Sequence, residues 1–151
     1  MTVSMNADEI LDFAIQKEQE AVELYTGLAN RTKSSAMKAE LEHIAGEERG
    51  HKAKLERVKS GKKLLGADAK VQDLKISDYT VDVELDDNPD YQSVLLFAMK
   101  QEKAAFKLYT DLAAVAPDAE LRELLLGLAQ EEAKHKLKFE IEYDQNILVE
   151  N

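Results

Sequence analysis

Apolar residues recur every three or four positions along two stretches of the chain, residues 6–60 and 89–143. This spacing is typical of amphipathic helices that bury one face. Each stretch is interrupted once, at residues 30–35 and at residues 116–118, where the helical period is lost. The pattern therefore predicts two helical hairpins.

Residues that commonly begin or end helices stand at the expected boundaries. Asn6 is a suitable N-cap for the first helix and Ser34 or Ser35 for the second, and Gly61 is a suitable stop. Residues 61–88 show no helical period and are too long for a tight turn, so they predict a long connection. The predicted parts of this single domain, residues 1–151, are a hairpin (6–60), a crossover (61–88), a second hairpin (89–143) and a tail (144–151) that either extends the last helix or packs elsewhere.

The two hairpins are copies of one another. Residues 14–58 align with residues 98–142 without a gap, at a constant shift of 84. Such an internal repeat indicates that one supersecondary unit occurs twice. Two hairpins joined by one long crossover predict an all-α, antiparallel four-helix bundle of up-down-down-up topology.

Polar residues interrupt the predicted apolar faces at equivalent places in both copies. Glu18 stands between Ala14 and Ala21 at helical spacing, and a Glu-x-x-His pair follows on the second helix of each hairpin. All of these side chains are predicted to point into the core. The candidate metal ligands are Glu18, Glu48, His51, Glu102, Glu132 and His135.

Four carboxylates in one core require compensation. A buried carboxylate is costly, and four together repel one another. Two divalent cations match the charge of four carboxylates while both histidines stay neutral. Carboxylate oxygen and imidazole nitrogen suit iron or manganese, and this set is the pattern of dimetal four-helix proteins.

The chain resembles the ferritin-like superfamily, and most closely the rubrerythrins. The resemblance covers roughly residues 6–143 and rests on Glu18, Glu102 and the two Glu-x-x-His pairs. It implies two iron ions per chain, with manganese or a mixed pair as the alternative. It further implies that Glu48 and Glu132 bridge the metals.

Two features depart from the rubrerythrins that the chain resembles. The chain has no cysteine, so it lacks the rubredoxin domain that supplies electrons in two-domain rubrerythrins. Ala105 stands where those proteins have a further glutamate, which moves the site towards the six-ligand pattern of bacterioferritin-like proteins. Electrons are therefore expected to come from a separate electron-donor protein. The family resemblance also implies a homodimer.

Composition narrows the partners. The net charge is −10, which repels phosphate backbones and anionic lipid, so we expect neither nucleic acid nor a membrane as a partner. No apolar run approaches the roughly 20 residues of a membrane span. No signal peptide is recognisable, so the expected location is cytoplasmic.

Other polar residues have more ordinary interpretations. Glu47 and Glu131 are duplicated, but the helical wheel places them on the solvated face, as it does the unduplicated His43. Tyr25 and Tyr109 follow Glu18 and Glu102 by two helical turns. Core filling with a hydroxyl bonded to a site carboxylate is favoured for both over a redox role.

Two further patterns leave a choice open. The duplicated Lys52 and Lys136 offer an alternative to metal, because they could neutralise the buried acids as an ion network. The alanines beside the glutamates reflect either helix propensity or room for metal and a small oxidant; they are Ala14, Ala21, Ala98 and Ala105.

The functional hypothesis is a non-haem di-iron oxidoreductase, a peroxidase or ferroxidase, that reacts with dioxygen or hydrogen peroxide in defence against oxidative stress. No catalytic residue is predicted beyond the metal ligands. One alternative is a ferroxidase with iron storage, which would need a large shell of subunits. Another is a metal-free helical interaction bundle, which metal analysis would distinguish.

Overall fold

The computed structural model describes residues 5–61, 70–71, 81, 91–116 and 119–150. Four helices make up nearly all of this part: α1 (Ala7–Arg31), α2 (Ser35–Gly61), α3 (Tyr91–Ala114) and α4 (Ala119–Glu150). Two strands of two residues each, β1 (Met5–Asn6) and β2 (Lys70–Val71), pair antiparallel. The sequence pattern did not predict this pair, whose strands are too short to show an alternation.

The helix boundaries follow from local chemistry. Ser34 caps α2, because its hydroxyl accepts a hydrogen bond from the backbone N–H of Met37 at 3.1 Å. The helix ends at Gly61, as predicted. The predicted start of the third helix at 88–90 and the break at 117–118 lie outside the described residues, whereas α4 continues through the predicted tail to Glu150.

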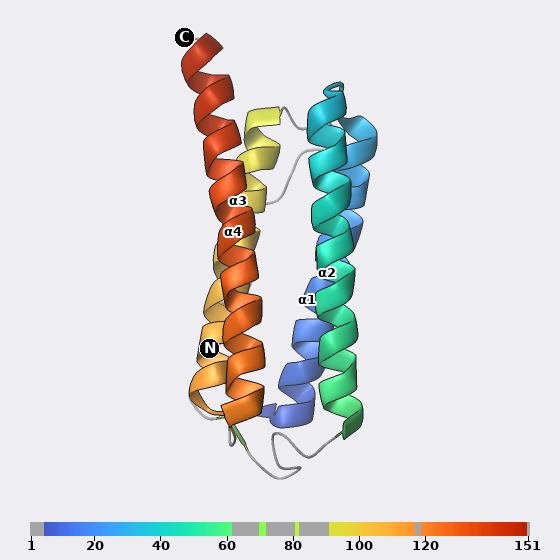
Figure 1. The fold of residues 1–151 in the computed structure, drawn as a ribbon, viewed down its shortest axis with the longest axis vertical. Coiled ribbons are helices and arrows are strands. Elements are labelled where there is room, and N and C mark those ends of the chain that lie inside the picture. The colour runs from blue at the N-terminus through green and yellow to red at the C-terminus, as the bar shows by residue number, and fades with distance from the viewer. Residues whose placement is uncertain (1–4, 62–69, 72–80, 82–90, 117–118, 151) are drawn as a thin grey trace.

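The helices form two antiparallel hairpins that stand side by side (Figure 1). Helix α1 rises and α2 descends in that view, and α3 descends before α4 rises, so α2 ends and α3 begins at opposite ends of the bundle. The all-α, up-down-down-up four-helix bundle predicted from the repeat is confirmed. Of the predicted crossover between the hairpins, the structure describes only Gly61, Lys70–Val71 and Val81.

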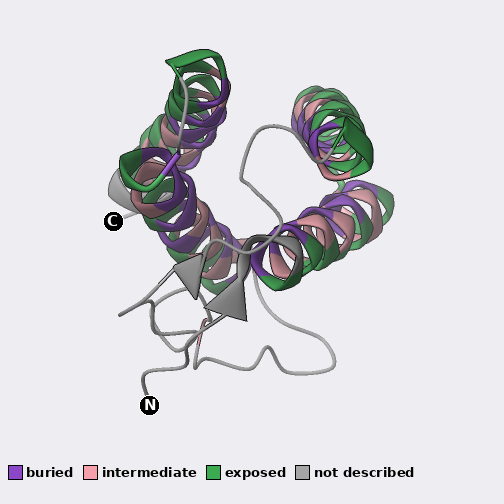
Figure 2. Ribbon diagram, turned by 90° about the horizontal axis from the view of Figure 1, so that it is seen from below, coloured by how far each residue is buried: buried purple, intermediate pink, exposed green. Residues whose placement is uncertain are grey.

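The buried faces of the helices point towards the bundle axis (Figure 2). Two apolar clusters occupy this interior. One is built around Ile10, Leu55 and Leu121, and the other around Ile44 and Phe139. Each helix contributes one segment to the first cluster and another segment to the second. The polar residues of the repeat lie between these two segments on every helix. The polar site is therefore closed above and below by hydrocarbon.

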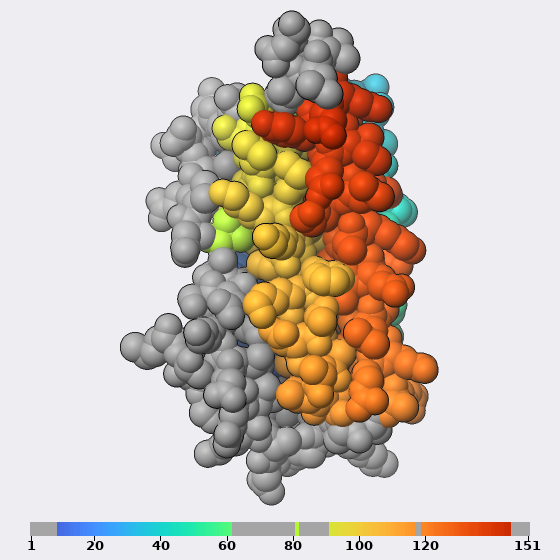
Figure 3. Space-filling model, turned by 90° about the vertical axis from the view of Figure 1, so that its left-hand side faces the viewer, coloured from blue at the N-terminus to red at the C-terminus, as the bar shows by residue number. Residues whose placement is uncertain are grey.

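The outward face of the second hairpin is distinctive. Figure 3 shows α3 and α4 packed along their length on this face. Among the described residues, the large apolar side chains that are exposed all belong to this hairpin or its turn: Leu96, Phe106, Val115, Leu126, Leu137 and Ile141.

None of the described helices combines the length and apolar character needed to cross a membrane.

Candidate metal centre

The buried polar residues of the bundle are the six that the sequence singles out. Each exposes at most 3% of its surface, and within the described part of the chain no other polar or charged residue is buried. The four helices share them: Glu18 on α1, Glu48 and His51 on α2, Glu102 on α3, and Glu132 and His135 on α4. Each glutamate takes a place in the apolar stripe of its helix, so ordinary helical packing directs it inward.

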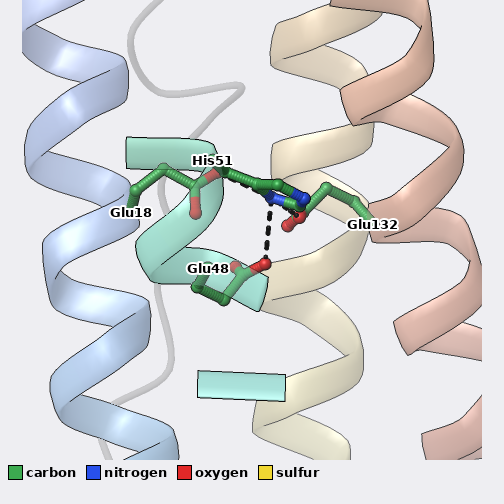
Figure 4. Close-up of side chains that lie close together, drawn as sticks. All are labelled: Glu18, Glu48, His51 and Glu132. Atoms are coloured by element: carbon green, nitrogen blue, oxygen red, sulfur yellow. Dashed lines mark ion pairs between the residues drawn. The ribbon is translucent and has the colours of Figure 1, made fainter. Parts of the chain in front are cut away.

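His51 lies at the centre of one group of carboxylates. Its Nδ1 is 2.8 Å from Oε1 of Glu132, 3.2 Å from Oε1 of Glu48 and 3.6 Å from Oε1 of Glu18. Figure 4 shows these side chains converging from three helices. The potential ligand atoms of the four residues all lie within 4.8 Å of one another.

His135 lies at the centre of a second group. Its Nδ1 is 3.4 Å from Oε1 of Glu48, 3.6 Å from Oε1 of Glu102 and 3.9 Å from Oε1 of Glu132. The rings of His51 and His135 stack with centroids 6.2 Å apart. Glu48 and Glu132 belong to both groups, so the geometry gives two adjoining positions that share two carboxylates.

The donor atoms fit a pair of metal ions. Every one of the six residues has a buried side-chain atom without a hydrogen-bond partner: Glu18 Oε2, Glu48 Oε1, His51 Nδ1, Glu102 Oε2, Glu132 Oε1 and His135 Nδ1. Buried polar atoms are normally hydrogen-bonded, and unpaired ones call for an explanation such as an ion. Oxygen and imidazole nitrogen are the ligands that iron and manganese accept.

Lysine does not neutralise the buried acids. Lys52 Nζ donates to Oε1 of Gln19 at 2.8 Å, and Lys136 pairs with Glu140 on its own helix. Among the described residues, the buried glutamates form ion pairs with imidazoles only. The lysine network is therefore wrong as an alternative to metal.

Burial raises the pKa of three of the four carboxyl groups. It brings the pKa of Glu18 to about 8. For Glu102 burial raises the pKa, and the charge of Glu48 adds to it. The pKa of Glu132 is raised well above its ordinary value by burial, with the charges of Glu102 and Glu48 adding to the effect. Without metal, burial therefore favours the protonated form of these three groups.

The pKa shifts of the other three groups favour their charged forms: a carboxylate at Glu48 and imidazolium ions at His51 and His135. Burial would raise the pKa of Glu48, but contacts with His135 and His51 outweigh it and hold the pKa below its usual range. Burial would lower the pKa of both histidines. The carboxylates around them prevail and raise the pKa of His51 to about 9 and that of His135 to about 11. A bound metal would have to displace protons from these ligands.

Two tyrosines connect the hairpins at the site. The hydroxyl of Tyr25 on α1 donates to Oε1 of Glu102 on α3 at 2.6 Å, and the hydroxyl of Tyr109 on α3 donates to Oε1 of Glu18 on α1. Both rings are fully buried. The bonds required by the core-filling interpretation are present, and each joins the tyrosine to the glutamate of the other hairpin.

Replacing Tyr25 by phenylalanine is expected to destabilise the metal-free protein by about 1–3 kcal/mol, because a buried carboxyl oxygen loses its donor. Thermal or denaturant unfolding measures this change. Tyr143→Phe is the matched control, since that half-buried hydroxyl interacts with the exposed Gln92. Equal stabilities of Tyr25→Phe and the parent chain would show that the bond contributes nothing.

The expectation that Glu47 is a surface residue is wrong. Its Oε2 lies 3.0 Å from Nε2 of the buried His135, and its side chain is 26% exposed. The side chain reaches across from α2 to α4, which a helical wheel of one helix cannot show. Two signals in the sequence could have indicated this contact. The Glu-Glu pair is duplicated, and a histidine that binds metal normally has a partner on its second ring nitrogen. His43 is exposed, as predicted, and pairs with Glu47 at 2.5 Å.

A small cavity adjoins the carboxylates on the α1–α3 side of the site. Its volume is about 20 Å³, and its lining includes Ala21 and Ala105 beside Glu18 and Glu102. That is room for about one water-sized molecule. Ala14 and Ala98, in contrast, belong to the two apolar clusters, so only one alanine of each predicted pair opens space at the site.

Comparisons with known proteins give a family and a fold for the chain. The family model described as Rubrerythrin matches residues 9–143, which is most of the chain. A comparison with curated proteins gives no match.

Two solved structures share the fold. One is a protein from Thermotoga maritima described as a candidate ferritin-like diiron-carboxylate protein, with a TM-score of 0.84 and 19% identity over 95% of this chain and 97% of the other. The second is a hypothetical protein from Pyrococcus furiosus, with a TM-score of 0.72 and 27% identity over 91% of this chain and 87% of the other.

Proposed function

The chain belongs to the rubrerythrin family, and from this premise we propose that it is a non-haem di-iron protein that reacts with dioxygen or hydrogen peroxide. The observation that carries the proposal is the buried donor set, in which two carboxylate–histidine groups share Glu48 and Glu132. Each group contains buried side-chain atoms that have no hydrogen-bond partner. In the proposed centre, Glu18 and His51 complete one iron site, and Glu102 and His135 complete the other.

Two ferrous ions would supply the two electrons that, with two protons, reduce hydrogen peroxide to two water molecules. The protein's part is to hold and shield the site. Tyr25 and Tyr109 fix the orientation of Glu102 and Glu18 through their hydroxyl bonds. The apolar clusters at both ends exclude bulk water, which strengthens the electrostatic interactions inside.

The size of the adjoining cavity supports a small oxidant over a larger substrate. About 20 Å³ beside Ala21 and Ala105 holds about one water-sized molecule, which leaves no room for a substrate of many heavy atoms. Repeated turnover needs a reductant, and a separate electron-donor protein acting on a homodimer is part of the proposal.

Anaerobic titration with ferrous iron is expected to saturate at about two ions per chain. Admission of oxygen or peroxide to the loaded protein should then produce ferric absorbance in the near ultraviolet, read by stopped-flow spectroscopy. Faster oxidation by peroxide favours a role in redox defence. Faster oxidation by oxygen, with continued iron uptake beyond two ions per chain, favours ferroxidase activity instead.

The matched variants for this titration lie two residues apart on α1. Glu18→Gln removes a proposed ligand and is expected to lower the iron content and slow oxidation strongly. Glu20→Gln changes an exposed acid of the same helix and should behave like the parent chain. Binding of far fewer than two ions by the parent chain, or identical behaviour of the two variants, would contradict the proposal.

A further inference from the structure

The second ring nitrogen of His135 is connected to the surface. Its Nε2 lies 3.0 Å from Oε2 of Glu47, whose Oε1 lies 2.5 Å from Nε2 of His43. The exposed fraction of the side chains falls along this row, from 62% for His43 through 26% for Glu47 to 1% for His135. The imidazole of His135 therefore contacts a carboxylate through the ring nitrogen that faces away from the buried glutamates.

His51 has no such support. All of its ion pairs use Nδ1, which faces Glu18, Glu48 and Glu132. Within the part of the chain that the structure describes, no hydrogen bond or ion pair involves its Nε2. The two imidazoles of the centre are thus bonded differently, although their positions in the repeat are equivalent.

The sequence repeat accounts for this difference. The counterparts of His43 and Glu47 in the second hairpin are Gly127 and Glu131. Glu131 pairs with Lys134 at 3.5 Å, and one of its carboxylate oxygens lies within 4.8 Å of ligand atoms of Glu47 and His135. Gly127 has no side chain that could hold Glu131 as His43 holds Glu47. The second hairpin therefore lacks the series of contacts that connects His135 to the surface.

A carboxylate behind an imidazole has a defined chemical effect. A neutral histidine carries one N–H, and an acceptor at Nε2 places the proton there. The lone pair of Nδ1 is then free, and in His135 that atom is buried without a hydrogen-bond partner among the glutamates. Such partners orient the ring and raise the basicity of the ligand, and their removal typically lowers metal affinity by about 10- to 100-fold.

We propose that Glu47, held in place by His43, is a positioning residue that makes the two metal positions unequal. The position formed with Glu102 and His135 binds a divalent cation first and more tightly, and the position formed with Glu18 and His51 fills second. This inference rests on the proposed function, because it requires that the two groups bind metal.

Titration of the metal-free protein with cobalt(II), followed by its visible absorbance, tests the order of filling. The parent chain is expected to bind two ions in two steps, with dissociation constants that differ by roughly 10- to 100-fold. Glu47→Gln should weaken the first step by at least about 10-fold and leave the second unchanged. Glu42→Gln, the same change at an exposed acid of the same helix, should keep the parent separation, since Glu42 belongs to none of the buried carboxylate–histidine groups.

Nuclear magnetic resonance of the zinc-loaded protein gives a second measurement that a merely structural role would not move. The chain has three histidines, so their ring nitrogens are readily assigned. His135 should show a slowly exchanging proton on Nε2 that shifts in Glu47→Gln, whereas His51 should not change.

The outcomes separate the inference from the proposed function. If the parent chain and both variants bind fewer than two cobalt ions, the dimetal centre itself is wrong. If the parent chain binds two ions with equal affinity, or if Glu47→Gln leaves the first step unchanged, the centre stands and the role of Glu47 is overturned.

Discussion

Loading the metal-free protein with ferrous or manganous ions is expected to raise its melting temperature by roughly 5–10 °C. A ligand at about 100 times its dissociation constant stabilises the folded state by about 2.7 kcal/mol, and each kcal/mol corresponds to about 2–4 °C for a domain of this size. The unfolded chain does not assemble the six donors, so the binding energy acts on the folded state alone.

Glu132→Gln should remove most of this increase without lowering the melting temperature of the metal-free protein. Burial raises the pKa of Glu132 well above its ordinary value and so favours its uncharged form in the absence of metal. A glutamine amide has nearly the same shape as this form and also carries no charge. With metal, the amide cannot replace a carboxylate shared by both groups. The double substitution Glu48→Ala and Glu132→Ala should abolish the increase completely.

Glu123→Gln is the control for this experiment, because Glu123 is an exposed acid on the same helix. It should keep the full metal-dependent increase. Calorimetric scans with and without metal supply both melting temperatures for each protein. A parent-like metal-dependent increase in Glu132→Gln, or in the double variant, would mean that the shared carboxylates are not ligands.

The internal repeat explains why so much of the site could be predicted. A single Glu-x-x-His pair is common by chance, but two pairs at one constant shift, each accompanied by an inward glutamate, restrict the arrangement to facing helices. The six residues follow from helical period alone, because each occupies an apolar register of its own helix. The structure places all of them in the buried interior.

Contacts between the hairpins could not be predicted in this way. The wheel of α2 gives the direction of Glu47 from its own axis but not its distance from α4, so its bond to His135 was missed. The tyrosine bonds have the same origin: Tyr25 reaches Glu102 and not the glutamate of its own hairpin. The β1–β2 pair was missed because two residues per strand form no pattern.

The arrangement also shows how a costly site is tolerated. Four glutamates with unpaired oxygens would destabilise a core if they were all charged. Burial raises the pKa of Glu18, Glu102 and Glu132, so the metal-free protein reduces its buried charge by keeping protons. The apolar clusters above and below supply the packing that keeps the four helices in place.

The stabilisation by metal should therefore increase as the pH rises from about 6 to about 8.5. The folded metal-free protein holds a proton on Glu18 up to a pKa of about 8, while the unfolded chain releases it near 4.5. His51 keeps its proton up to a pKa of about 9, against 6.5 when unfolded. Between the unfolded and folded pKa values of each group, the folded metal-free protein binds more protons than the unfolded chain. Its free energy of unfolding therefore falls by about 1.4 kcal/mol per pH unit for each such proton.

The metal-loaded protein does not share this loss, because its ligands have already released their protons. Glu48, whose pKa is lowered, contributes stability above pH 4.5 and stays constant across this window. Melting curves with manganese and with a chelator, recorded in parallel across the pH range, give the difference directly. Glu18→Gln should flatten the decline of the metal-free protein, whereas Glu20→Gln should leave it unchanged. A metal-dependent increase that stays constant or shrinks with rising pH would show that the buried groups do not exchange protons for metal.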